Sequence, residues 1–191
     1  MDNYCDILRY MGHNGKVEKQ LETLISSCLE KLAAVLDQRH VIMQLPCTVT
    51  DDNVTIDTMK IKSKALAARL NSCTQAYLFA ATLGADVDRL IAQRAKMDSA
   101  EALCVQAFAS VQIEDYCDSI EKELINGAKQ QGMQLSPRFS PGYCDFDIAH
   151  QTDLLRLLEA HKRIGVSETK SHMLTPLKSV TAIIGRRAGE I

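Results

Sequence analysis

The chain lacks tryptophan, long apolar runs and any excess of basic charge, and each absence excludes a class of protein. Aromatic residues make up 5% of its 191 residues, and no basic stripe is interleaved with them. Because nucleic-acid-binding surfaces cluster Lys and Arg, often beside aromatic side chains, we expect no nucleic-acid partner. No stretch approaches the roughly 18 apolar residues of a bilayer-spanning helix, and the first residues do not resemble a signal peptide. We therefore expect a cytoplasmic protein with no membrane association.

What is present fits an ordinary globular domain. The net charge is −2, from 22 basic and 24 acidic residues, and 46% of the residues are hydrophobic. These values lie near the average for folded soluble proteins, which disfavours disorder. A chain of this length can bury a substantial core, so we expect a single domain over residues 1–191.

The cysteines show neither a metal site nor a disulfide framework. There are seven, an odd number, with no Cys-x-x-Cys pair and no zinc-like Cys/His spacing, and the five histidines are dispersed. We predict no metal, reduced structural thiols, and histidines that are solvated or locally hydrogen-bonded. Cys28 and Cys104 lie on helical apolar stripes and should be buried. Cys144 directly follows a predicted turn, and we expect it to be exposed.

Apolar periodicity predicts several helices. The clearest covers residues 17–36, and the longest runs from Asp98 to about Ala128, where Asn126-Gly127 should fray its end. Asp98 and Glu101 have the spacing of a capping box. Shorter helices are predicted at 63–70, from Ala85 onward, and from Asp147 to Leu158.

Strands are predicted at 75–81, 165–166 and 179–184, with a β-hairpin over 47–57. This irregular alternation of helices and strands predicts an α+β fold, in which helices flank a mostly antiparallel sheet. Gly84 lies between the 75–81 strand and the next helix, where it would either form a tight connection or help a helix N-terminus bind an anion. A single glycine lacks the pattern of a doubly wound methyltransferase, so that class is disfavoured.

The segment Arg138-Phe-Ser-Pro-Gly-Tyr143 carries the most local chemistry. Pro141 and Gly142 are typical of the two central positions of a type II turn, so the chain should reverse there and leave backbone groups at the tip available to a ligand. Arg138 offers a planar cationic fork for a carboxylate, and Tyr143 an aromatic face for a flat base or a sulfonium. The alternative is a surface turn with a solvated Arg and a packed Tyr.

The flanks of this segment carry a resemblance. Arg138–Tyr143 is followed in order by Asp145, Gln151, Leu154-Leu155, Ile164-Gly165-Val166 and Met173-Leu-Thr-Pro-Leu-Lys-Ser-Val180. Ile7–Gly12, Ala81-Thr-Leu-Gly84 and Glu114 precede it. Together these strings resemble the activation (reactivation) domain of cobalamin-dependent methionine synthase, in the stand-alone form that some bacteria carry. The resemblance spans nearly the whole chain and implies a twisted, mostly antiparallel sheet flanked by helices.

The resemblance also implies a function. The family's domain binds S-adenosylmethionine and presents its methyl group to cobalamin held on a partner domain. One electron from a flavodoxin- or ferredoxin-like donor, coupled to methyl transfer, returns inactive cob(II)alamin to methylcobalamin. Such a module needs no nucleophile or general base of its own, so no catalytic residue is expected.

By the same resemblance, Arg138, Pro141, Gly142 and Tyr143 would form the S-adenosylmethionine site, with Ser179 beside it. Arg138 would hold the methionyl carboxylate, the Gly142 region would offer backbone contacts, and Tyr143 would line the pocket. Glu114 is either a ligand to the amino group or a buried structural acid, and the second interpretation is favoured. Ile183-Ile184-Gly185 stands where fused enzymes place aromatic residues that cover the ligand.

Two alternatives remain open. The chain could activate a different corrinoid methyltransferase, or it could be a non-catalytic interaction module that has lost ligand binding. Binding of S-adenosylmethionine separates the last from the others, and reactivation of a methionine synthase without its own activation domain separates the first two.

Overall fold

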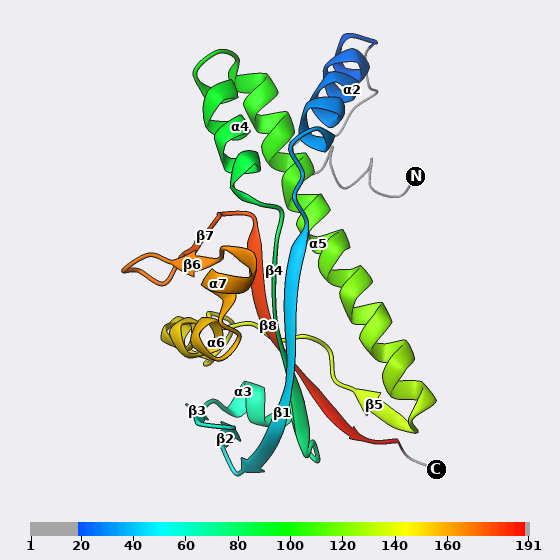
Figure 1. The fold of residues 1–191 in the computed structure, drawn as a ribbon, viewed down its shortest axis with the longest axis vertical. Coiled ribbons are helices and arrows are strands. Elements are labelled where there is room, and N and C mark those ends of the chain that lie inside the picture. Colours follow the sequence, from blue (N-terminus) through cyan, green and yellow to red (C-terminus); the bar gives the residue numbers. More distant parts are fainter. Residues whose placement is uncertain (1–18, 190–191) are drawn as a thin grey trace.

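The computed structural model describes residues 19–189 (Figure 1). Several sequence features lie outside these residues: the start of the first predicted helix, the Ile7–Gly12 string of the resemblance, Cys5 and His13. Within the described residues no helix is both long enough and apolar enough to span a bilayer. No group of three or more His, Cys, Asp or Glu side chains in this part of the chain is placed to hold a metal ion.

The architecture is built on a six-stranded sheet in the order β3-β2-β1-β4-β8-β5, in which every neighbouring pair is antiparallel. The long central strands lie side by side over most of their length, and β6 and β7 form a separate two-stranded ribbon. The strands are β1 (Arg39–Thr50), β2 (Asn53–Ile56), β3 (Met59–Lys62), β4 (Gln75–Thr82), β5 (Met133–Leu135), β6 (Ser167–Glu168), β7 (Leu174–Thr175) and β8 (Ser179–Ala188).

Helices cover both faces of this sheet. Figure 1 shows α5 running diagonally along one side, with α2 and α4 beside its first turns and α3, α6 and α7 on the other side of the central strands. The helices are α2 (Lys19–Ala33), α3 (Lys64–Arg69), α4 (Ala85–Ala95), α5 (Ser99–Gln130), α6 (Gln151–Leu157) and α7 (Ala160–Ile164), with a 3₁₀ turn, η1 (Ile148–His150). The predicted α+β fold class is confirmed.

Two hydrophobic clusters follow from the period-two alternation of side chains along a strand. On β4, Leu78 and Ala80 belong to the cluster under α3, α6 and α7, whereas Phe79 and Ala81 belong to the cluster under α2, α4 and α5. The same alternation on β8 places Ile183 on the α6 side. The sheet is therefore buried on both faces, which explains why its central strands read as compact apolar runs.

Several predicted elements form as expected. The 47–57 hairpin pairs β1 with β2, and Ser63 caps α3 by accepting a hydrogen bond from the Leu66 N–H at 3.0 Å. Gly84 connects β4 to α4 with φ of +87°, and its N–H donates to Thr82 Oγ1 at 3.1 Å. Because that N–H already has a partner, the tight-connection interpretation of Gly84 is the one that the structure supports.

Other expectations are wrong, and tertiary contacts explain why. Asp98 caps α5 through the N–H groups of Ala100 and Glu101, but the Glu101 carboxylate pairs with Lys31 and Arg94, so the capping box is not reciprocal. Helix α5 does not fray at Asn126-Gly127 but continues to Gln130, with Ala128 buried beyond the glycine.

Strand boundaries were the least predictable feature. The expected 165–166 strand is absent, because Gly165 ends α7 with φ of +72° and the strand β6 begins only at Ser167. Strand β1 begins at Arg39 rather than Cys47, and β3 was not predicted. The helix expected from Asp147 to Leu158 forms in two steps, the 3₁₀ turn η1 and then α6.

Candidate functional site

A cavity of about 520 Å³ lies over the first residues of β8. Its walls come from α5, the 138–143 loop, η1 with the start of α6, and the segment from His172 to Thr181. This volume lies within the range of about 300 to 1,000 Å³ typical of small-molecule sites. Segments far apart in the sequence therefore meet at one place.

Five of the six predicted site residues line this cavity: Glu114, Arg138, Pro141, Tyr143 and Ser179. Gly142 is not among the lining residues. Its φ is +90°, the positive value predicted for it, and a Cβ there would lie 2.9 Å from Ile148 Cδ1. The backbone expectation was wrong for this residue, because its N–H donates to the Phe146 carbonyl at 2.7 Å and is not free at the tip. Gly142 thus shapes the loop from within.

The loop is held in place by its own residues. Asp145 accepts hydrogen bonds from Ser63 Oγ at 2.6 Å and from the N–H groups of Lys64 at 2.7 Å and Ala65 at 3.1 Å. The hydrogen bond from Ser63, with those from the backbone, lowers the pKa of Asp145 against the opposing effect of burial. The carboxylate thereby ties the cavity loop to the first turn of α3.

Aromatic packing supports the loop from behind. Phe139 and Phe146 are buried and stacked, with ring centroids 6.0 Å apart, and the guanidinium of Arg69 lies 4.6 Å from the centroid of Phe139. Phe139 also pairs with Ile183 of β8, donating and accepting a backbone hydrogen bond at 2.9 Å. These contacts fix the loop against the sheet next to the cavity.

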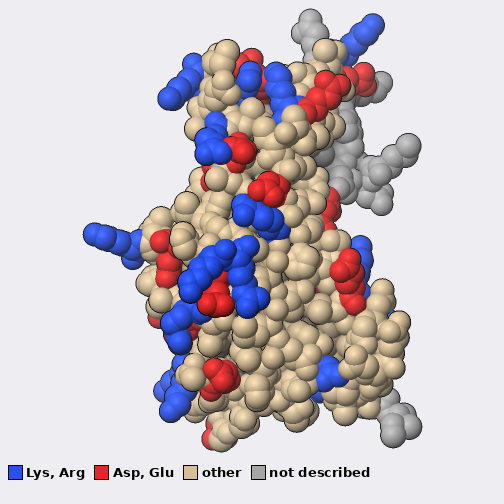
Figure 2. All heavy atoms as spheres, viewed as in Figure 1, with Lys and Arg blue, Asp and Glu red and all other residues tan. Residues whose placement is uncertain are grey.

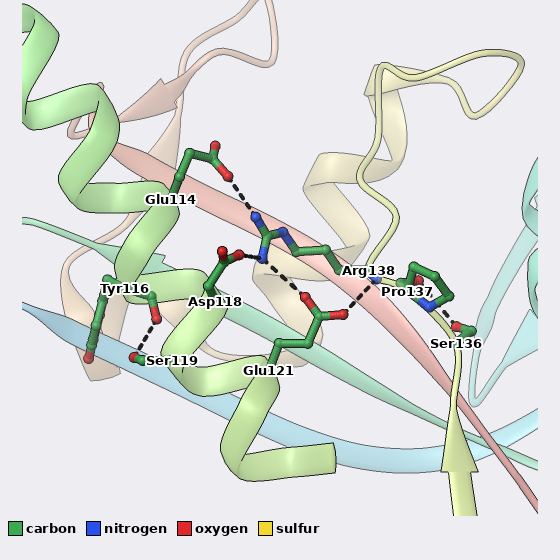
Figure 3. A network of polar contacts seen from close by, with 8 residues as sticks. All are labelled: Glu114, Tyr116, Asp118, Ser119, Glu121, Ser136, Pro137 and Arg138. Atoms are coloured by element: carbon green, nitrogen blue, oxygen red, sulfur yellow. Dashed lines mark hydrogen bonds and ion pairs between the residues drawn. The ribbon is translucent and has the colours of Figure 1, made fainter. Parts of the chain in front are cut away.

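Arg138 is surrounded by acidic residues of α5 (Figure 3). Its Nη1 lies 2.5 Å from Asp118 Oδ1 and 3.1 Å from Glu121 Oε2, and its Nη2 lies 2.7 Å from Glu114 Oε2. The backbone N–H of Arg138 also donates to Glu121 at 3.3 Å. A guanidinium has five N–H donors, so three are used and two have no partner within residues 19–189.

The electrostatics of this cluster follow from its composition. One guanidinium and three carboxylates give a net charge of −2 if all are ionised. Burial alone would lower the pKa of Arg138, but its hydrogen bond and charge interaction with Asp118 and the other negative groups raise it. Burial raises the pKa of the neighbouring Cys117 thiol to about 12, so this cysteine is not a nucleophile at neutral pH.

The favoured interpretation of Glu114 as a buried structural acid is wrong. Its side chain is 54% exposed, lines the cavity and pairs with Arg138. Ile113, Cys117 and Ile120 form the buried stripe of α5, and Glu114 lies next to that stripe, one position on from Ile113. Helical periodicity identifies the stripe, but it did not indicate that Glu114 would face a loop that follows 24 residues later.

The alternative of a surface turn with a solvated Arg and a packed Tyr is also wrong. Tyr143 is 65% exposed, and Arg138 is paired with acidic side chains. Three further exposed apolar side chains line the same cavity: Ile148, Met173 and Leu177. We call Tyr143, Ile148, Met173 and Leu177 the apolar rim. Figure 2 shows basic and acidic side chains interspersed over the visible face rather than gathered by sign.

Sequence reasoning missed other cavity residues. No local pattern points to Arg69 or Ile148, and the resemblance includes Gln151 without implying a role for it. His172, expected to be solvated or locally hydrogen-bonded, lies on the cavity with its Nδ1 2.8 Å from Glu168 Oε2. Cys28 and Cys104 are buried and Cys144 is exposed, as predicted.

The segment Ile183-Ile184-Gly185 does not line the cavity, contrary to the expectation for residues that would cover a ligand. Ile183 and Ile184 are fully buried in the sheet. A Cβ at Gly185 would lie 2.5 Å from Leu70 Cδ2, so the strand packs too closely there for a side chain. The absence of aromatic residues at these positions therefore leaves the cavity wall unchanged.

Comparison with known proteins agrees with this architecture. No family model and no curated protein matches the sequence. Among solved structures, the crystal structure of the MetH reactivation domain bound to AdoHcy superposes with a TM-score of 0.71 at 18% sequence identity. The match covers 93% of this chain and 71% of that chain, and it shows that the chain has a reactivation-domain-like fold.

Proposed function

We propose that this protein binds S-adenosylmethionine in the cavity and supports reductive remethylation of cob(II)alamin on a cobalamin-dependent methionine synthase. The observation that carries the proposal is the meeting of Arg138, Glu114 and Tyr143 on one cavity within a reactivation-domain-like fold. The bound AdoHcy of the structural neighbour, S-adenosylhomocysteine, is the demethylated form of the proposed ligand and supports this choice.

The charged end of the cavity suits the methionyl part of the ligand. Arg138 would donate its two remaining N–H groups to the ligand carboxylate while the acidic residues of α5 hold the guanidinium in place. Glu114, which is partly exposed on the cavity wall, would accept the ligand amino group. A cationic sulfonium is also favoured by the net negative charge of the cluster.

The remaining predicted residues have positional roles in this proposal. Tyr143 would line the pocket with its ring, and Pro141 and Gly142 would set the turn that places Tyr143 and Arg138 on the same cavity. Ser179, at the start of β8, donates to Thr82 Oγ1 at 2.9 Å and would form part of the floor.

The apolar rim would be the docking surface for the cobalamin-binding domain of the partner. Tyr143, Met173 and Leu177 are exposed and line the cavity, so they would surround the opening through which the methyl group is presented. Cobalt of the partner's cofactor would supply the nucleophile, and a flavodoxin- or ferredoxin-like protein the electron. The chain's own residues would bind and orient the methyl donor, which is a contribution of proximity rather than of acid–base chemistry.

The decisive experiment has two stages. Purified protein is first titrated with S-adenosylmethionine in a calorimeter, because the absence of binding would leave only the non-catalytic interaction module. Protein that binds is then added to a methionine synthase lacking its own activation domain, with cob(II)alamin, flavodoxin and its reductase. Recovery of methyl transfer from methyltetrahydrofolate to homocysteine supports the proposal. Ligand binding without recovery would favour a different corrinoid methyltransferase as the partner.

A further inference from the structure

Gln151 is a buried polar residue on the cavity wall, and it has no part in the ligand contacts proposed for Arg138, Glu114 and Tyr143. Gln151 is the first residue of α6, and it is only 3% exposed. Within the described residues its Nε2 is buried and has no hydrogen-bond partner, although Gln151 lines the cavity. A buried amide N–H without a partner is unfavourable for folding, so such a group next to a cavity indicates a ligand contact.

The edge of β8 beside the cavity also carries unused hydrogen-bonding groups. Ile183 exchanges both backbone hydrogen bonds with Phe139, on the edge that faces away from β4. Because backbone groups alternate in direction along an antiparallel strand, the N–H and C=O of Thr181 point to that same edge. Among residues 19–189 no strand covers this edge at Thr181, since β5 pairs with Arg186–Ala188 and the isolated bridge lies at Ile183.

Gln151 and Thr181 belong to one wall of the cavity. Helix α6 packs against β8, both residues line the cavity, and Thr181 is 2% exposed. Glu114 lines the cavity from α5, on a different element from Gln151 and Thr181. Figure 1 shows β8 between α6 and α5. The cavity thus has a charged wall on α5 and a neutral hydrogen-bonding wall on α6 and β8.

We propose that the wall formed by Gln151 and the free edge of β8 at Thr181 is the subsite for the purine base of the ligand. This inference rests on the proposed function. The Thr181 N–H donates to N1 of adenine and its C=O accepts from the exocyclic amino group. Gln151 donates from Nε2 to another ring nitrogen, which a rotation of its terminal amide permits because that torsion is broad.

The groups on this wall are uncharged, which favours binding of the base there over the charged parts of the ligand. An amide and a backbone edge offer no full charge for a carboxylate or an ammonium group, which would instead meet Arg138 of the 138–143 loop and Glu114 of α5. Apolar Ile148 and Leu174 line the same cavity and suit the faces of a planar ring.

The test compares two ligands and two variants by calorimetric titration. The ligands are AdoHcy and its inosine analogue, in which a carbonyl replaces the adenine amino group and N1 carries a proton. The variant Gln151→Leu removes the donor at similar volume, and Gln134→Leu makes the same change at an exposed position of β5 outside the cavity. Melting of each ligand-free protein is recorded as well.

We expect the wild type to bind the inosine analogue at least tenfold more weakly than AdoHcy, and Gln151→Leu to weaken AdoHcy binding about tenfold, as for one lost hydrogen bond. Ligand-free Gln151→Leu should melt no lower than the wild type, because the unpartnered amide is gone, and Gln134→Leu should bind normally. Equal binding of the two ligands by the wild type would overturn the inference, even if Gln151→Leu failed to fold. Unchanged AdoHcy binding by folded Gln151→Leu would also overturn it. Failure of the wild type to bind AdoHcy or S-adenosylmethionine at all would instead refute the proposed function.

Discussion

Replacing Arg138 by methionine removes the guanidinium and keeps most of the aliphatic stem. Arg138 makes three ion pairs with N–O distances from 2.5 to 3.1 Å. The Glu114 and Asp118 partners are 54% and 51% exposed, so water screens these pairs and each contributes at most about 1 kcal/mol. Glu121 is 19% exposed and its pair is worth more, about 1 to 2 kcal/mol. We expect Arg138→Met to lower the free energy of unfolding by about 2 to 3 kcal/mol.

The same substitution should weaken ligand binding separately from folding. Loss of a charge-assisted hydrogen bond to the ligand carboxylate, worth about 1.5 to 3 kcal/mol, raises the Kd for AdoHcy about 10- to 100-fold. Stability is measured by urea unfolding at 0.1 M and 1 M NaCl, and binding by calorimetry at a temperature where the variant is folded. The stability loss should shrink at 1 M NaCl, because the screening length falls from about 10 Å to about 3 Å and repulsion among the three carboxylates weakens.

A matched control separates the effect of losing Arg138 at this position from the general effect of replacing an arginine by methionine. Arg156 is 59% exposed, and the partner it has among the described residues is Asp153, one turn away, so Arg156→Met should change stability by less than about 0.5 kcal/mol and leave binding unchanged. The reasoning is refuted if folded Arg138→Met binds AdoHcy with the affinity of the wild type. It is also refuted if Arg138→Met and Arg156→Met lose equal stability.

Three further predictions concern the loop and the sheet. Gly142→Ala should cost about 1 to 2 kcal/mol in urea unfolding, because φ of +90° is strained for alanine and the added Cβ would meet Ile148; unchanged stability would show that the loop can relax. For Asp145, whose folded pKa is depressed, the stabilisation is present above the unfolded value of about 3.9 and is lost as the pH falls through the lower folded value. The stability difference between the wild type and Asp145→Asn should therefore be larger at pH 7 than in strong acid, and a constant difference from pH 7 to pH 2 would contradict this. Burial lowers the pKa of Lys178, with Asp88 opposing the shift, so its charged form is disfavoured in the fold and stability should rise as the pH increases through the folded value. Lys178→Met should be at least as stable as the wild type at pH 7 and lose this advantage toward pH 10, whereas a lower melting temperature at pH 7 would show that its hydrogen bond to Ser110 outweighs burial.

Local patterns predicted most of the core elements. The long helix α5, the short helix α3 and the strand β4 depend on residues close in sequence, and all three form as expected. The first half of β1 was missed because its strand conformation depends on pairing with β4, which is distant in the sequence. Strand β3 pairs with the adjacent β2, but it has only four residues, a short run for a period-two pattern. Residues 39–46 pair with residues of β4 that lie 29 to 43 positions later, and only Val41 among them is buried.

The site residues likewise fall into those that local sequence predicts and those that depend on tertiary packing. The turn chemistry of Pro141 and Gly142 and the fork of Arg138 are local, so the sequence pointed to them. That Glu114 faces Arg138 and that Gln151 shares a wall with Thr181 depends on how α5, α6 and β8 pack, which no local pattern contains. At the site, the exposure of individual side chains was also hard to predict, as Glu114 and Tyr143 both show.

The central claim is that the loop carrying Arg138 and Tyr143 walls a site for a sulfonium nucleoside. Thermal unfolding with and without S-adenosylmethionine tests it most directly, since a ligand that binds only the folded state must stabilise it. At a ligand concentration about 100 times the Kd, the gain of about 2.7 kcal/mol corresponds to a rise in Tm of about 5 to 10 °C for a domain of this size. We predict such a rise for the wild type and a much smaller one for Arg138→Met; no shift with millimolar ligand would contradict the account.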